Sequence, residues 1–196
     1  MQVLDVTCGN KDIICVYEYC DRGTLKDYIL EEKRMEEVDV LRIFIKIALG
    51  VDFMHYKHVI SKNLSSEHIY VKTANEGMRF KIGSFSNSTV VKQTLALTKC
   101  HGYDLRYQAP EIQGVFDDDK FNNRADVYAL GVILYEMCSK KVTGSIDIDE
   151  VCQDVKDLGY SDEMVEILEM LLEPAGDNRK SIMEIIRAVP TLLKSM

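Results

Sequence analysis

The sequence lacks the long apolar runs and the leader segment that membrane and secreted proteins carry. No stretch of the 196 residues approaches the ~18 consecutive apolar positions of a membrane-spanning helix. The amino-terminal residues do not form a positively charged segment followed by an apolar run, as a secretory signal would. These absences predict a cytoplasmic protein without a membrane partner.

Cysteine pairs and a surplus of basic residues are also missing. The six cysteines include no Cys-x-x-Cys pair, which argues against a zinc site or a disulfide framework and predicts reduced thiols. Asp and Glu exceed Lys and Arg by 32 to 24, so the formal net charge is −8. An acidic chain offers no broad basic surface to nucleic acid. We therefore expect no metal, no cofactor and no nucleic-acid partner.

The stretch from Arg124 to Cys138 is apolar on nearly every side of a helical projection. A helix of this kind belongs in the core of a domain. Asp126 lies at its start, and a lone buried carboxylate is costly unless hydrogen-bond donors bind it. The pattern therefore predicts a central buried helix whose Asp126 is held by donors from other segments.

Apolar periodicity predicts the elements around this helix. Runs 1–7 and 13–19 flank Gly9-Asn10, which indicates a hairpin, and alternation around the turn 73–77 indicates a second hairpin over 69–82. Further helices are predicted over residues 24–29, 38–58, 148–158, 164–172 and 181–190, where Pro190 should perturb or end the last one. Residues 84–111 show no clear periodicity, which predicts a long functional loop.

Four landmarks resemble those of protein kinases in their order and spacing. Tyr17-Glu18-Tyr19-Cys20, followed by Gly23-Thr24-Leu25, resembles the hinge and the helix after it. Ala109-Pro110-Glu111 resembles the end of an activation segment, and the residues from Asp126 to Val132 resemble the central helix of the kinase C-lobe. Arg179 lies where kinases place the arginine that pairs with the glutamate of that segment. The resemblance covers nearly the whole chain.

The resemblance implies a mainly α (α+β) fold. It would be a protein kinase-like C-lobe with a central buried helix and a short amino-terminal β-hairpin left from a truncated N-lobe. Residues 1–20 would hold the remaining N-lobe strands and the hinge, and residues 21–196 the C-lobe. The hinge residues would be Tyr17, Glu18 and Cys20.

The resemblance also implies structural roles for three residues. Asp126 would bind backbone amides of the 61–63 loop, and Glu111 would pair with Arg179 under the activation segment. Breaking one side of such a buried pair costs ~3 to 5 kcal/mol, so the presence of both partners indicates that the fold is in use.

The positions that carry kinase chemistry depart from the family's pattern. Phosphoryl transfer needs a lysine on the phosphates, ligands for Mg²⁺ and a base near the acceptor hydroxyl. The resemblance places Ser61-Lys62-Asn63 over His-Arg-Asp, His68 over a metal-binding Asn, and Ser84-Phe85-Ser86 over Asp-Phe-Gly. Asn63 would then replace the catalytic Asp and Ser84 the metal-binding Asp, while the phosphate-binding lysine would be absent. We therefore expect no catalytic residue and no enzyme, but a pseudokinase.

The main functional hypothesis is a catalytically inactive pseudokinase that binds or sequesters a kinase or a kinase-associated protein, with homo- or heterodimers as a further option. Ser65-Ser66 occupies a position where tyrosine kinases often carry Ala-Ala, which favours the tyrosine-kinase and tyrosine-kinase-like branches. Together with the hinge, it is similar to the mixed-lineage-kinase-like pseudokinase of necroptosis. One alternative is therefore a decoy, viral or cellular, that inhibits necroptosis or another kinase-driven defence pathway. Others are residual ATP binding or weak phosphotransfer through Glu67, and a fragment of a longer kinase-like protein.

Several side chains have simpler interpretations beside the functional ones. Asn63 can serve as a polar loop residue bonded to neighbouring backbone, His68 as a hydrogen-bonded loop residue, and Tyr107 as a packing residue. Hydroxyl groups of the 84–111 segment are candidate phosphorylation sites, at Ser88, Thr89, Thr94, Thr98 and Tyr103.

Overall fold

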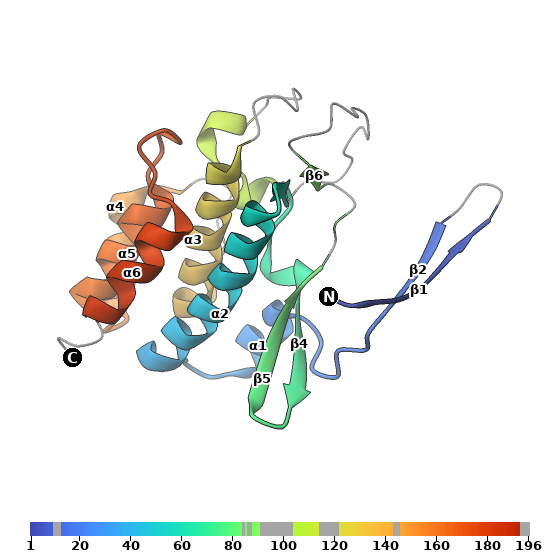
Figure 1. Cartoon of the computed structure of the whole chain (residues 1–196). Helices are drawn as coiled ribbons and strands as arrows, with labels where there is room; N and C mark the ends of the chain where they lie inside the picture. The colour runs from blue at the N-terminus through green and yellow to red at the C-terminus, as the bar shows by residue number, and fades with distance from the viewer. Residues whose placement is uncertain are drawn as a thin grey trace.

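The computed structural model describes residues 1–9, 13–83, 85, 88–90, 104–113, 122–142 and 146–192. Helices make up most of this part, and small two-stranded sheets lie along one side of them (Figure 1). The mainly α (α+β) fold class expected from the sequence is confirmed. The division at residue 20 remains a prediction.

The helices of the described residues form one packed body. Helix α3 contacts α2 on one side and α4 and α5 on the other, and α6 packs against both α2 and α5. Their bounds are α1 (Leu25–Glu31), α2 (Glu37–Tyr56), α3 (Asn123–Ser139), α4 (Ile148–Asp157), α5 (Asp162–Leu172) and α6 (Ile182–Leu192).

Helix α3 is the centre of the core, as its sequence predicts. Every residue from Ala125 to Cys138 is buried, and the Asn122 side chain caps the first turn by accepting from a backbone N–H. Gly131 lets α5 approach closely, because a Cβ at this position would lie 2.7 Å from Leu172 Cδ2. A side chain at position 131 would therefore push α3 and α5 apart.

The predicted helix starts carry side-chain caps. Thr24 and Asp27 form a capping box at α1, and Ser181 and Glu184 exchange the same pair of contacts at α6. Ser161 caps α5 by accepting from the backbone N–H of its third residue. Local sequence therefore fixes where these helices begin.

Two short sheets line the helical body. Strands β4 (Ile69–Ala74) and β5 (Gly77–Ile82) form the predicted second hairpin, with Ala74 paired to Gly77 across a tight turn. Strands β3 (Val59–Ile60) and β6 (Thr89–Val90) form a second antiparallel pair. The latter pair was not predicted, because two-residue strands are too short to show an alternating pattern.

The first hairpin, β1 (Val3–Cys8) with β2 (Ile13–Tyr17), extends away from the helices (Figure 1). Its apolar side chains are exposed rather than packed, at Val3, Leu4, Val6, Ile13, Ile14, Val16 and Tyr17. An isolated two-stranded hairpin is marginally stable in water. These strands therefore need a cover that the described residues do not supply.

The last helix differs from its prediction. Helix α6 continues through Pro190 to Leu192, so the proline does not end it. A proline in the final turn removes one backbone hydrogen bond but leaves the preceding turns intact. Within the described ranges, no helix is both long enough and apolar enough to cross a membrane.

Candidate functional site

The loop of residues 61–65 joins β3 to the short 3₁₀ helix η1 (Ser66–His68) and is buried. Lys62 adopts a positive φ of 62°, which residues other than glycine rarely adopt. Backbone strain of this kind persists only where the surroundings fix the conformation. The contacts around Lys62 show what fixes it.

Asp126 of α3 holds this loop with a carboxylate that is almost wholly buried. Its Oδ2 accepts from the Ser61 N–H at 2.8 Å, and its Oδ1 accepts from the Lys62 N–H at 3.1 Å. The contact expected between Asp126 and the loop amides is therefore present. His55 Nε2 lies 2.9 Å from the same carboxylate, a third partner that nothing in the sequence indicated.

Asn63 is bonded to the backbone of a residue from a distant segment. Its side-chain oxygen accepts from the backbone N–H of Asp104 at 3.4 Å. Arg106 donates two hydrogen bonds to the Asp104 carboxylate, from Nε at 2.8 Å and from Nη2 at 2.6 Å. Burial acts to raise the pKa of Asp104, but the hydrogen bonds from Arg106 outweigh it and hold that pKa below its usual value. The residue whose backbone bonds Asn63 therefore carries an ionised carboxylate, and that carboxylate is bound by Arg106.

Arg106 also connects Asp104 to two further charged side chains. Arg106 Nη2 lies 3.7 Å from a carboxylate oxygen of Glu67, and Glu67 also pairs with Lys26 of α1. These groups are partly exposed, so solvent weakens each pair. Lys26, Glu67, Arg106 and Asp104 therefore form a row of side chains with alternating charge next to the loop.

His68 is engaged inside the loop. Its Nδ1 lies 2.8 Å from the Asn63 carbonyl oxygen and 3.1 Å from Ser65 Oγ. One ring nitrogen is therefore used to shape the loop, in line with the simpler of the two interpretations above. Within the described ranges, no group of three or more His, Cys, Asp or Glu side chains could hold a metal ion.

A buried carboxylate that the sequence analysis missed lies beneath the loop. Glu136 of α3 accepts from Tyr107 Oη at 2.6 Å and from Ser66 Oγ at 3.0 Å. Burial raises the pKa of Glu136, and the two hydroxyl donors only partly offset that effect. The network ties η1 and η3 (Leu105–Tyr107) to the central helix, so Ser66 has a structural task here.

Glu111 and Arg179 form the second expected pair. The guanidinium is fully buried and donates to both carboxylate oxygens of Glu111, at 2.7 and 3.0 Å. It also donates to the backbone carbonyl oxygens of Arg124 and Glu173 and lies 5.0 Å from the centre of the Tyr128 ring. Through Arg179, Glu111 is therefore tied to the start of α3 and to the residues that follow α5.

A small hollow lies between the loop and α3, lined in part by Asn63, Asp104, Gln108 and Asp126. Its volume of about 10 Å³ leaves room for one water molecule and no larger ligand. Any reacting group must therefore approach Asn63 from the outer side of the loop.

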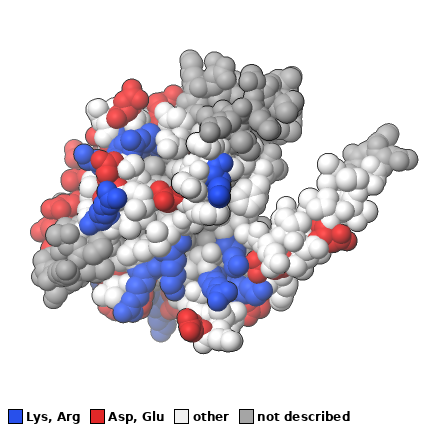
Figure 2. Space-filling view, in the orientation of Figure 1, with Lys and Arg blue, Asp and Glu red and all other residues white. Residues whose placement is uncertain are grey.

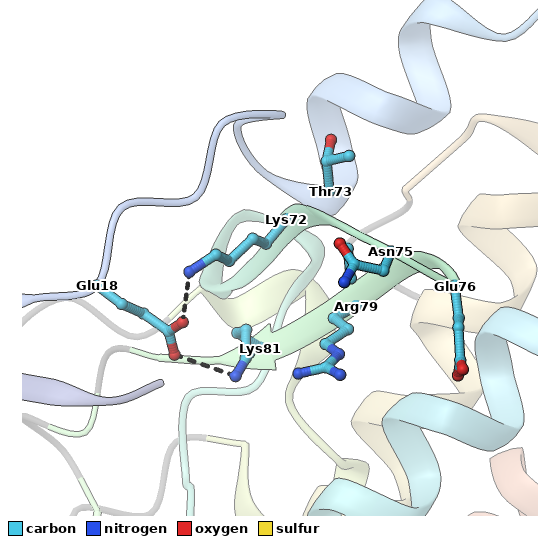
Figure 3. A pocket seen from close by; sticks show the side chains of 8 residues that line it. Glu18, Lys72, Thr73, Asn75, Glu76, Arg79 and Lys81 are labelled. Atoms are coloured by element: carbon cyan, nitrogen blue, oxygen red, sulfur yellow. Dashed lines mark hydrogen bonds and ion pairs between the residues drawn. The ribbon is translucent and has the colours of Figure 1, made fainter.

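The hinge residues connect the exposed hairpin to the helices. Glu18 reaches Lys72 of β4 at 3.0 Å and Lys81 of β5 at 3.1 Å (Figure 3). The hydrogen bond from Lys72, followed by those from the Gln2 N–H and Lys81, lowers the pKa of Glu18 to about 2. Tyr17 is exposed and Cys20 is half-buried, with a thiol pKa raised by burial.

The remaining candidates are only partly within the described residues. Ser84, Ser86, Thr94, Thr98 and Tyr103 lie outside them. Phe85 is exposed, Ser88 Oγ donates to the Ser61 carbonyl oxygen at 3.4 Å, and Thr89 lies in β6. Ser88 is thus brought to the loop, where a phosphate group would disturb an existing contact.

Comparisons with known proteins match the chain to protein kinases. A family model described as "Protein kinase domain" matches residues 1–189. Serine/threonine-protein kinase Nek3 of Mus musculus is 30% identical over 128 residues, which cover 64% of this chain and 24% of that protein. Serine/threonine-protein kinase Nek5 of Homo sapiens is 26% identical over 189 residues, which cover 91% of this chain and 26% of that protein. The carbon catabolite-derepressing protein kinase of Secale cereale is 31% identical over 150 residues, which cover 76% of this chain and 28% of that protein.

These matches correct one prediction and weaken others. The prediction that the chain is not an enzyme is wrong, because the proteins that it matches are named as protein kinases, and Nek3 and Nek5 as serine/threonine-protein kinases. That prediction rests on the residues at 61–63 and 84. It also rests on the absence of a phosphate-binding lysine, which a longer protein can supply. The tyrosine-kinase-like lineage and the decoy role find no support among the matches. The chain spans about a quarter of the length of the curated relatives it matches.

Proposed function

The chain belongs to the protein kinase domain family, and on this premise we propose that it forms the helical lobe of a longer serine/threonine protein kinase. Such a kinase transfers the terminal phosphoryl group of ATP to a serine or threonine hydroxyl. The observation that carries the proposal is the buried carboxylate of Asp126, which fixes the loop amides of Ser61 and Lys62. Phosphoryl transfer depends mainly on positioning, so a rigidly held loop is what the reaction needs.

The exposed first hairpin supports the view that this lobe is part of a longer protein. Side chains such as Ile13 and Leu4 are 71% and 59% exposed, and they lie on strands that are marginal alone. Further strands of the same protein would bury them. We keep the division into hinge-proximal residues 1–20 and the lobe of residues 21–196 as part of this proposal, and the cytoplasmic location as a prediction.

The chemistry at the loop would be shared between two neighbouring side chains. The Asn63 amide would orient the acceptor hydroxyl, and the carboxylate of Asp104, whose backbone N–H bonds Asn63, would take the proton. Support comes from the hydrogen bond between Asp104 N–H and Asn63 Oδ1 and from the ionised state that Arg106 imposes on Asp104. A loose transition state places little demand on a strong base, so a carboxylate of lowered pKa suffices.

The test is phosphate transfer from ATP to a serine or threonine peptide by the full-length protein that carries this chain. Asp104→Asn should lower kcat by about 10²-fold, the size of a lost general base, and leave the KM for ATP unchanged. Glu166→Gln is the matched control, because Glu166 is exposed on α5 and its change also converts a carboxylate to an amide. No transfer by the wild-type protein would refute the proposal.

A second candidate function is protein binding through the exposed hairpin. Val6 and Ile13 lie on the same face of β1–β2 and are 51% and 71% exposed. Apolar surface of this kind often marks an interface. If the hairpin is uncovered in the full-length protein, the double change Val6→Thr with Ile13→Thr should abolish partner capture without lowering the unfolding midpoint.

A further inference from the structure

A hollow lies along the β4–β5 hairpin, beside Glu18 of the hinge (Figure 3), and no residue of the 61–65 loop lines it. Its volume is about 380 Å³, and it is lined by Glu18, Lys72, Thr73, Ala74, Asn75, Glu76, Arg79 and Lys81. Basic side chains gather over this part of the surface in a chain that is acidic as a whole (Figure 2). The hollow therefore differs in charge from the protein around it.

Strand register places three cations on the same face. Lys72 is paired directly with Arg79, and Lys81 lies two residues beyond Arg79 on β5. Like charges directly opposite one another destabilise a hairpin unless an anion lies between them. The face is therefore arranged around a negative charge.

Glu18 supplies only part of that charge. Its two oxygens are taken by Lys72 and Lys81, and its pKa of about 2 keeps it ionised at neutral pH. Arg79 is exposed and has no ion-pair partner in the part of the chain that the structure describes. With Lys72, Arg79 and Lys81 against Glu18 and Glu76, the lining carries a net charge of 3 − 2 = +1.

We propose that this hollow binds a phosphorylated serine or threonine side chain of a peptide. The guanidinium of Arg79 presents a planar fork that matches two phosphate oxygens, and Lys72 adds a second positive charge across the strand pair. The exposed side chain of Asn75 can bond the peptide backbone at the rim. This site lies apart from Asn63 and does not depend on phosphate transfer by the lobe.

The lining also argues against a nucleotide as the ligand. It contains no aromatic side chain on which a base would stack. A phosphomonoester is largely dianionic at pH 7, so it suits a face on which the unpaired Arg79 lies opposite Lys72, whose charge Glu18 shares with Lys81. A phosphorylated peptide therefore fits the chemistry better.

The test measures binding of a short fluorescein-labelled peptide that carries one phosphothreonine between alanine and glycine residues, using the full-length protein. We expect the phosphorylated peptide to bind and its unphosphorylated form not to bind. Arg79→Gln should weaken binding by about tenfold or more, the range of a lost charged hydrogen bond. Arg42→Gln, which removes the same charge from α2, should leave the Kd unchanged because Arg42 pairs with Asp39 at an exposed site.

Several outcomes would overturn the proposal. One is equal binding by the Arg79→Gln and Arg42→Gln proteins, because nonspecific attraction to positive charge would explain it. Another is displacement of the peptide by ATP or inorganic phosphate at concentrations equal to that of the unlabelled phosphopeptide, which would assign the hollow to a free phosphate ligand. Loss of phosphate transfer by the lobe would leave the proposal intact, so the two functions are tested separately.

Discussion

Replacing Asp126 with alanine should strongly destabilise the lobe, because the carboxylate holds a strained and buried loop. The change removes the acceptor for the Ser61 and Lys62 amides and leaves His55 without its partner. Each unsatisfied buried donor costs about 1 to 3 kcal/mol, and the positive φ of Lys62 loses the contact that fixes it. We expect a loss of about 3 to 5 kcal/mol in the free energy of unfolding.

Urea unfolding followed by circular dichroism measures this change. The midpoint should fall while the slope m stays constant, which shows that stability rather than compactness has changed. Asp126→Asn should cost less than alanine, since its oxygen still accepts from one amide, but its NH₂ group then faces the other donor. Glu166→Ala on the exposed face of α5 is the control and should shift the midpoint little. An Asp126→Ala protein with the control's midpoint would refute the reasoning.

Two further predictions follow from the other charged contacts. Arg179→Met should lower the free energy of unfolding by about 3 to 5 kcal/mol, because the partly buried Glu111 carboxylate loses its partner and the buried carbonyl oxygens of Arg124 and Glu173 lose their donor. Exposed Arg187→Met should change the urea midpoint little. Equal midpoints for these two proteins would contradict the role given to Arg179. The lowered pKa of Glu18 predicts that its tether between hinge and hairpin is present above pH 4.5 and is lost as pH falls toward 2. Hydrogen-exchange protection of the Gln2 amide, which donates to Glu18, should fall over that range, and the same fall in Glu18→Gln would count against the assignment.

Sequence predicts those features whose signal is local. The fully apolar stretch at 124–138 indicates a buried helix, and the caps at Thr24, Ser161 and Ser181 mark helix starts within one turn of sequence. The second hairpin follows from alternation over a dozen residues. The contacts of Asp126 follow from the kinase resemblance rather than from any local pattern.

The features that sequence misses are pairs of residues far apart in the chain. Ser66 and Glu136 are 70 positions apart, and Asn63 and Asp104 are 41 apart, with no local pattern to connect them. Glu136 lies inside an apolar helix, where periodicity indicates only burial and not the hydroxyl groups that will meet it. Tertiary packing decides such contacts.

The error about catalysis has a different origin. A motif treats residues 61–63 and 84 as independent positions, so each departure from it predicts a loss of function. Phosphoryl transfer depends on positioning and charge, and groups from neighbouring segments can supply what one position lacks. Asp104 is the group proposed here, and only the fold brings its backbone N–H to Asn63.

The most direct test of this account is the rate of phosphate transfer from ATP by the full-length protein, wild type against Asp126→Asn, at a temperature where both are folded. The account predicts measurable transfer to serine or threonine by the wild type and a loss of about 10²-fold or more in the variant, since the loop would no longer be held in place. Equal rates for the two proteins, or no transfer by the wild type, would contradict the claim that the Asp126-held loop serves phosphate transfer.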